Sequence, residues 1–218
     1  TRRHLTEFWM VEPEMAFCDL EQNMDWAEKH VEYVVRHCLE YCRNELETLE
    51  RDIKKLENIT LPFPRITYND AVEILKNNNV DFEYGSDFGA ADESIISNQY
   101  QKPVMVHRWP AESKAFYMKR DPKNLNLALG VDMIAPEGYG EIVGGGQRED
   151  DYEVLINRIK EHNLPIEHFK WYLDLRKFGS VPHSGFGLGI ERTVAWISGT
   201  KHIRETIPYP RTMYRLEP

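Results

Sequence analysis

The sequence predicts an α+β fold in which an antiparallel β-sheet is flanked by helices. Strands joined by short turns pair antiparallel, whereas parallel strands need a long crossover between them. A long amphipathic segment before these strands and further helical segments after them would supply the covering layers. Four stretches rich in apolar and aromatic residues or in glycine carry the strand prediction, namely Val104–Trp109, Ala115–Lys119, Leu125–Ile134 and Gly140–Gly146.

The N-terminal part predicts one strand and two helices. The strand covers Phe8–Phe17, where aromatic and aliphatic residues dominate. A long helix is expected over Glu21–Glu57, because apolar residues recur every three to five positions. The prolines in Leu61–Pro64 end it. A short helix follows over Asn69–Lys76, with Thr67 as its N-cap.

The remaining segments complete the predicted covering layers. Asp81–Asn98 is acidic and contains glycine, which predicts a loop with a short helix. Helices are expected over Asp150–His162 and Pro165–Lys177, and the apolar run Thr193–Ile197 predicts a last helix.

Composition narrows the class of protein. The chain has 218 residues, a net charge of −9 and 41% hydrophobic residues, which suits one globular domain and argues against a surface for indiscriminate nucleic-acid binding. No apolar run approaches the roughly 20 residues that span a bilayer. Three cysteines, Cys18, Cys38 and Cys42, form no disulfide framework. A metal clip of Cys38 and Cys42 with His37 is an alternative to core-facing thiols. Because the cysteines form no disulfide framework, we expect the protein to reside in a reducing compartment, the cytoplasm.

Alternating glycines in Gly185–Arg192 predict a nucleotide pocket. Glycine lets the backbone approach a ligand, and the N-terminus of the helix that follows attracts phosphate. The alternative is a tight packing joint between a strand and a helix. A dinucleotide fold does not fit, because Ser180–Ser184 before the motif resembles a loop and too little chain follows Gly199 for another βαβ unit. No glycine-rich loop ends in the Gly-Lys-Ser/Thr of a P-loop.

A second glycine-rich stretch, Glu141–Arg148, begins with an acid and ends with a base. Glu141 is a candidate Mg²⁺ ligand, and Arg148 can form a fork onto a carboxylate or an amide oxygen. Their odd separation would point them to opposite faces of a regular strand, so we expect a bulge that brings both to one face. A glycine-rich strand end beside a surface arginine is the alternative.

Two further pairs of charged residues lie near the N-terminus. Strand alternation puts Glu12 and Glu14 on one face, where they would either form a structural ion pair or recognise a ligand. Arg3 and His4 could hold a polyphosphate or belong to a solvated loop.

Taken together, these stretches resemble the catalytic domain of class II aminoacyl-tRNA synthetases of the aspartate/asparagine group. The resemblance covers essentially all of residues 1–218, with several long motifs in the family's order. The matching segments are Arg3–Phe17, Pro110–Pro122, Pro136–Arg148, Gly185–Arg192 and Pro208–Arg211.

The resemblance implies that ATP binds with Mg²⁺, that an aminoacyl-adenylate forms, and that the amino acid passes to the 3′ end of a tRNA. Phe8 and Arg192 would sandwich adenine, Arg3, His4 and Arg192 would act on the phosphates, and Glu141 would hold Mg²⁺. The residues implied to contact ATP are Arg3, His4, Leu5, Phe8, Glu141, Gly189, Ile190, Glu191 and Arg192. Those implied to contact the amino acid are Glu12, Gly144 and Arg148.

Glu12 points to the amino acid. In members that activate aspartate, the position that matches Glu12 is a shorter Asp. The Val-Glu-Pro-Glu of this chain instead resembles members that activate asparagine and charge tRNA(Asn). A carboxylate here can accept a hydrogen bond from the side-chain amide of asparagine, whereas it repels the side-chain carboxylate of aspartate. Three alternatives stay open. They are aspartate activation, a paralogue that makes asparagine from aspartate, ATP and ammonia, and a non-catalytic binding module.

The resemblance also implies a partial catalytic domain. The first strand of motif 2, the motif 1 dimer helix and the anticodon-binding barrel of the family have no counterpart in residues 1–218. We expect them in a longer polypeptide, which as a member of this group would form a homodimer.

Overall fold

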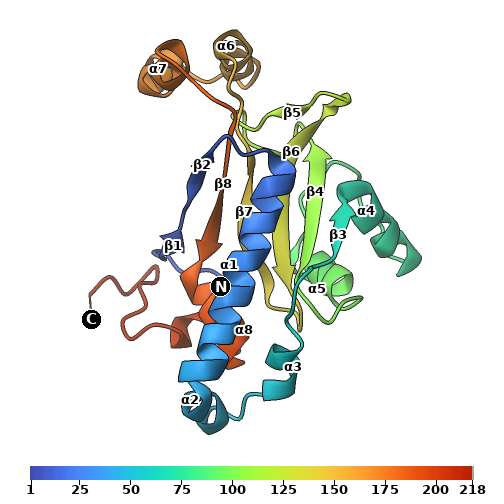
Figure 1. Cartoon of the computed structure of the whole chain (residues 1–218), viewed down its shortest axis with the longest axis vertical. Coiled ribbons are helices and arrows are strands. Elements are labelled where there is room, and N and C mark those ends of the chain that lie inside the picture. The colour runs from blue at the N-terminus through green and yellow to red at the C-terminus, as the bar shows by residue number, and fades with distance from the viewer. Residues whose placement is uncertain (218) are drawn as a thin grey trace.

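The computed structural model describes residues 1–217 and confirms the α+β fold, with a mostly antiparallel sheet and flanking helices (Figure 1). The strands are β1 (Met10–Val11), β2 (Glu14–Ala16), β3 (Arg65–Thr67), β4 (Val104–Pro110), β5 (Arg120–Asp121), β6 (Asn124–Ala135), β7 (Gly140–Gln147) and β8 (His183–Gly189). They lie in the order β1-β8-β7-β6-β4-β3, with β2 also paired to β8 and β5 to β6.

Helices cover both faces and both ends of this sheet. They are α1 (Leu20–Tyr41), α2 (Arg43–Thr48), α3 (Ile53–Glu57), α4 (Tyr68–Asn77), α5 (Ala90–Ser97), α6 (Tyr152–Glu161), α7 (Lys170–Lys177) and α8 (Ile190–Ser198), with 3-10 turns at Ile166–Phe169 and Ile203–Glu205. Figure 1 shows α1 lying along one face, with α6 and α7 at one end of the sheet and α8 at the other. Within residues 1–217, no helix combines the length and the apolar character that a bilayer crossing requires.

Strand alternation sorts the residues of β8 between the two faces. Phe186 and Leu188 are buried in the core that α1 closes with Met24 and Val31. The residues between them are glycines, which therefore lie on the opposite face. At these positions β8 thus contributes side chains to the core on one face of the sheet and has only glycines on the other face.

That second face is covered only in part. Tyr68 of α4 and Ile96 of α5 pack with Val106, Trp109 and Ile134 of β4 and β6. The helix α4 begins at the predicted N-cap, and Thr67 and Asp70 form a capping box there. Because α4 and α5 cover the β4 and β6 side, the glycine-rich surface of β7 and β8 stays open.

The prediction of one long helix over Glu21–Glu57 was wrong, because this segment forms three helices, α1, α2 and α3. Cys42 leaves helical geometry with φ −121° and ψ 24°, and Glu50 adopts a φ of 56°. Cys38 packs partly buried against the core, and all three cysteines are free. Hydrophobic spacing could not show these breaks, because it continues across them.

Three strand predictions also need correction. The stretch 115–119 forms turns, where Met118 makes one isolated bridge to Arg148, and Phe116 and Tyr117 pack on the α6–α7 hairpin. The predicted strand 8–17 is divided at Glu12–Pro13 into β1 and β2, although its register with β8 continues unchanged across the gap. His183 and Ser184, expected in a loop, belong to β8.

Two further differences concern pairing and helix type. The strand β3 was not predicted, and its parallel pairing with β4 departs from the otherwise antiparallel sheet. The helix expected over residues 165–177 begins as a 3-10 turn before α7.

Candidate active site

The open face of the sheet has a floor of glycines. Gly144 of β7 lies opposite Gly187 of β8, and Gly146 lies opposite Gly185. A Cβ on Gly187 would collide with the Met10 side chain, and one on Gly185 would lie 2.7 Å from the Glu14 Cδ. Glycine is required here because side chains from β1 and β2 lie flat across β8, which leaves room for a ligand above it.

The predicted bulge in β7 is present. The register with β6 shifts between Met133, which pairs with Val143, and Ile134, which pairs with Glu141, so Ile142 is the extra residue. The bulge thus lies just before the glycine run. It puts Glu141 on the same face as Gly144, whose Cβ would stand 2.5 Å from the Glu141 carboxylate. Gly146 and Arg148 follow on that face by alternation, so both charged ends of the motif face the open side.

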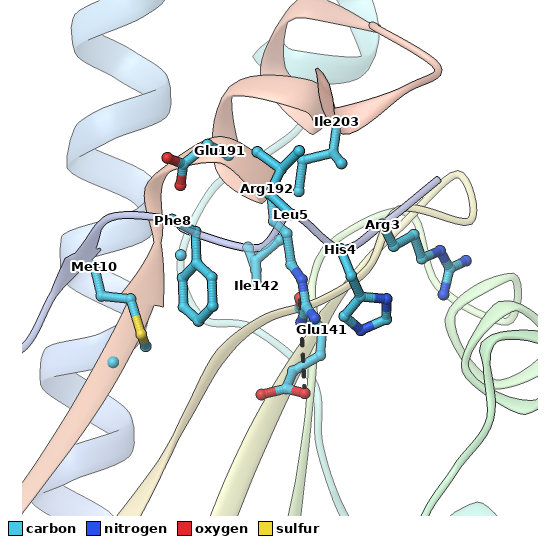
Figure 2. Close-up of a pocket in the computed structure, with 12 residues that line it drawn as sticks. Arg3, His4, Leu5, Phe8, Met10, Glu141, Ile142, Glu191, Arg192 and Ile203 are labelled. Carbon is cyan, nitrogen blue, oxygen red and sulfur yellow. Dashed lines mark hydrogen bonds and ion pairs between the residues drawn. The ribbon is translucent and has the colours of Figure 1, made fainter. Parts of the chain in front are cut away.

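A cavity of about 240 Å³ lies over this floor at the N-terminal end of α8. Figure 2 shows the Phe8 ring on one side of it and the Arg192 side chain extending toward Glu141. The Arg192 Nη1 donates to the Glu141 carbonyl at 2.9 Å and lies 3.7 Å from the carboxylate. Among residues 1–217, the side chains and glycines that line this cavity are Arg3, His4, Leu5, Phe8, Met10, Glu141, Ile142, Gly187, Gly189, Glu191, Arg192 and Ile203.

A second cavity of about 260 Å³ adjoins the first, because His4, Glu141 and Arg192 line both. It is the acidic part of the site, since Asp132 and Glu93 also line it. Burial and the nearby Asp132 raise the pKa of Glu141 from 4.5 to about 8, and Arg192 opposes the shift. Burial likewise raises the pKa of Asp132 and of Glu93. Carboxylates crowded in this way gain from a cation between them.

Two bases, Lys114 and His4, lie beside these carboxylates. The Lys114 Nζ donates to Asp132 at 2.6 Å and lies 3.8 Å from the centre of the Trp109 ring. Burial lowers the pKa of His4, and the charge of Arg192 lowers it further. The imidazole is therefore biased toward its neutral form at the junction of the two cavities.

Glu12, Glu14 and Arg148 lie beyond the first cavity along β8. By alternation Met10, Glu12 and Glu14 share one face, and a Cβ on Gly187 would stand 3.7 Å from the Glu12 Oε1. The Arg148 side chain is only 16% exposed and forms an ion pair with Glu14. The structure thus brings the acidic and basic residues predicted for one site onto one face of the sheet.

Three residues predicted to contact ATP, namely Arg3, Glu191 and Ile190, make contacts that the sequence did not predict. Arg3 Nη1 pairs with Glu93 at 2.8 Å, and in Figure 2 its guanidinium points away from Arg192. Glu191 is buried and accepts the Trp9 amide at 3.0 and 3.1 Å, so it fixes β1 to the start of α8. Ile190 lines a neighbouring cavity together with Trp9 and Glu191.

Sequence analysis missed Asp132, Glu93 and Lys114. One signal existed for Asp132, because it is a single charge within the apolar stretch Leu125–Ile134. A buried acid inside such a strand needs a partner. Glu93 and Lys114 gave no comparable signal, since both stand in mixed polar segments.

The sheet and the open site on it have the class II synthetase catalytic fold. The chain belongs to the class II tRNA synthetases (D, K and N), whose family model matches residues 1–213. This confirms the resemblance stated from the sequence.

Two relatives and one solved structure to which the chain is similar are named for asparagine. The chain is 60% identical over its whole length to the asparagine–tRNA ligase of Desulforamulus reducens and 58% identical to that of Koribacter versatilis. It spans 51% of each of these proteins. Among solved structures it resembles asparaginyl-tRNA synthetase from Pyrococcus horikoshii complexed with asparaginyl-adenylate, with a TM-score of 0.97 and 50% identity over 100% of this chain and 50% of that one.

Proposed function

We propose that this chain is the catalytic part of an asparagine–tRNA ligase. It would bind ATP and asparagine, join them as asparaginyl-adenylate, and support transfer of asparagine to the 3′ end of tRNA(Asn). The observation that carries the proposal is the shared glycine floor, in which Gly187 lines the cavity of Phe8 and Arg192 and also lies beside Glu12. The similarity to the Pyrococcus horikoshii asparaginyl-tRNA synthetase, which was solved in complex with asparaginyl-adenylate, supports the proposal.

The nucleotide end of the site fits ATP. Phe8 is 56% exposed and lies beside the cavity, where its ring can stack on adenine opposite the Arg192 guanidinium. His4 and Arg192 stand between the two cavities, where they can bind phosphate oxygens and stabilise charge that develops on the α-phosphate. The chain's main contribution is therefore positioning, which holds a carboxylate in line with that phosphate.

The acidic cavity fits Mg²⁺. Glu141 and Asp132 provide two hard oxygen donors, and burial raises the pKa of both, so a cation bound between them would favour the ionised carboxylates. Residues 1–217 contain no cluster of three or more acidic, His or Cys side chains arranged for a metal, so phosphates and water would complete the shell. When bound, Mg²⁺ would neutralise phosphate charge.

The amino-acid end favours an amide. Glu12 forms no ion pair with any residue between 1 and 217, so its carboxylate can accept hydrogen bonds from the side-chain NH₂ of asparagine. Arg148 would donate to the side-chain oxygen. Aspartate would bring a second carboxylate against Glu12, which is unfavourable.

We expect Glu12→Ala to lower kcat/KM for asparagine about 100-fold, because the amide loses its acceptor. The KM for ATP should stay within about threefold, since Glu12 lies outside the Phe8 cavity. Asparagine-dependent ATP–pyrophosphate exchange measures both, in the longest natural polypeptide that contains residues 1–218. Glu40→Ala, an exposed change on α1, is the control.

Equal exchange by Glu12→Ala and the unsubstituted protein would contradict the assignment of Glu12. Exchange with aspartate in place of asparagine would contradict the proposed substrate. A protein that binds neither ATP–Mg²⁺ nor asparagine in isothermal titration would be a non-catalytic module. Transfer to tRNA(Asn), assembly as a homodimer and residence in the cytoplasm remain parts of the same proposal.

A further inference from the structure

A lysine neutralises one acid of the cavity that we assign to Mg²⁺. The Lys114 Nζ donates to the Asp132 Oδ2 at 2.6 Å and lies 3.8 Å from the centre of the Trp109 ring. The side chains of Lys114 and Asp132 are only 16% and 13% exposed. Because a buried ion pair of this kind is neutral as a whole, Asp132 offers little attraction to a free cation.

A glycine of β6 lets this lysine reach Asp132. Lys114 belongs to the segment between β4 and β5, and its stem lies over Gly130, where a new Cβ would stand 3.6 Å from the Lys114 Cγ and 3.7 Å from its Cε. Gly130 and Asp132 share one face of β6 by alternation. The lysine stem can therefore run along the strand to the carboxylate, since no side chain lies in its way.

The two oxygens of Asp132 have different surroundings. Oδ2 accepts from Lys114, whereas a Cβ on Gly144 would stand 3.6 Å from Oδ1 and 2.5 Å from the Glu141 Oε1. Oδ1 and the Glu141 carboxylate thus lie on either side of the same glycine. Lys114 leaves one oxygen of Asp132 directed to the place where two carboxylates could share a cation.

Two other acids of this cavity have base partners that a nucleotide could take. Arg3 pairs with Glu93 at 2.8 Å, and Arg192 lies 3.7 Å from the Glu141 carboxylate. Both arginines line the cavity, so phosphates that enter it can bind them and add negative charge. Lys114 is not among the residues of 1–217 that line the cavity, so it would stay on its carboxylate. Attraction for a divalent cation therefore rises when phosphates arrive.

We propose that Lys114 is a positioning residue that acts as the built-in counter-ion of Asp132 and keeps a free divalent cation from binding before the nucleotide does. The inference deepens the proposed function and rests on its Mg²⁺ site. A lysine with only a structural role would stabilise the fold without changing the affinity for metal. A lysine that serves as counter-ion weakens metal binding, so its removal strengthens that binding.

Lys114→Met tests the charge, because methionine keeps an unbranched stem but has no charge. The measurement is a titration with Mn²⁺ as the probe metal, in which electron paramagnetic resonance follows the free ion. It uses the longest natural polypeptide that contains residues 1–218, without nucleotide. We expect the Kd for Mn²⁺ to fall about tenfold, since a unit charge beside the ligand oxygen is removed. Lys114→Arg keeps the charge and should leave the Kd nearly unchanged.

Two further variants locate the effect. Lys119→Met is the matched control, because Lys119 is 26% exposed and pairs with Glu149 at 3.4 Å, away from this cavity's lining. Adding Asp132→Asn to Lys114→Met should abolish the gain, since an amide replaces the carboxylate. Thermal unfolding checks that each variant folds. If Lys114→Met does not fold, Lys114→Gln, which can still donate to Asp132, gives the same test.

Mn²⁺ binding that is equal or weaker in the uncharged Lys114 variant than in the unsubstituted protein would overturn the inference and leave the proposed function standing. Tighter binding that persists after Asp132→Asn, or that appears equally in Lys119→Met, would also overturn it, because Asp132 would then not be the group that Lys114 neutralises. Absence of asparagine-dependent ATP–pyrophosphate exchange in the unsubstituted protein would instead refute the proposed function, which these nucleotide-free titrations do not test.

Discussion

Replacing Glu141 by glutamine should make the nucleotide-free protein more stable at alkaline pH, although Glu141 belongs to the site. Burial raises the pKa of this carboxyl from 4.5 to about 8, with Asp132 adding to the shift and Arg192 opposing it. A raised pKa means that the folded state prefers the protonated acid. The contribution of Glu141 to stability is therefore fully present below pH 4.5 and is lost as pH rises through 8.

The magnitude follows from the shift. Moving a pKa from 4.5 to about 8 corresponds to about 5 kcal/mol without screening. The Glu141 side chain is 38% exposed at the mouth of the cavity, so water screens a large part of this cost. We expect Glu141→Gln to raise the free energy of unfolding by about 1–2 kcal/mol at pH 9 and by almost nothing at pH 5. For a chain of 218 residues this is about 3–6 °C in melting temperature.

Thermal or urea unfolding at pH 5 and pH 9, without nucleotide or divalent metal, measures the difference between the two proteins. Glu137→Gln provides a control of opposite sign. Burial would raise the pKa of Glu137, but hydrogen bonds from Arg51 and Lys55 outweigh it and lower that pKa. That variant should lose stability at both pH values. A Glu141→Gln protein that is equally or less stable than the unsubstituted protein at pH 9 would refute the reasoning.

Three further changes separate binding from folding. Phe8→Ala should weaken ATP binding about 10- to 100-fold in calorimetric titration, because a stacked base loses its aromatic partner, while the melting temperature stays unchanged for a ring that is 56% exposed. Gly145→Ala should destabilise the fold by about 3 kcal/mol or more in urea unfolding, since the new Cβ would lie 2.6 Å from the Phe186 Cα and closer still to a backbone carbonyl. An unfolding midpoint equal to that of the unsubstituted protein would contradict this. Thr67→Ala should cost about 1 kcal/mol in the same assay by removing the hydroxyl that accepts the Asp70 amide at 3.2 Å, and an intact melting curve would argue against a role for this cap.

Local chemistry made some elements predictable. Thr67 and Asp70 specify the start of α4, and the prolines near residue 62 end the helical segment that precedes them. The alternating glycines of Gly185–Arg192 predicted a nucleotide pocket, with a tight joint between a strand and a helix as the alternative, and the structure has β8 followed directly by α8 there. The bulge at Ile142 could be expected, because the charged residues of one motif had an odd spacing.

Other features depend on contacts between distant segments. The stretch 115–119 has the composition of a strand, but its aromatics pack on the α6–α7 hairpin, and the sequence gives no local sign of that partner. The parallel pairing of β3 with β4 joins segments about 40 residues apart. Likewise, the sequence suggested a phosphate ligand in Arg3, whereas its pairing with Glu93 depends on where α5 lies.

The position of Gly187 explains how two chemically different pockets could serve the proposed reaction. It lies beside Met10, which lines the cavity that we assign to the nucleotide, and beside Glu12, which we assign to the amino acid. A side chain at this point would stand between the two ligands. Adenylate formation requires the amino-acid carboxylate to approach the α-phosphate directly, so the boundary between the pockets must stay open. The alternation of β8 provides this opening at no loss to the core, because the neighbouring Phe186 and Leu188 remain buried on the other face.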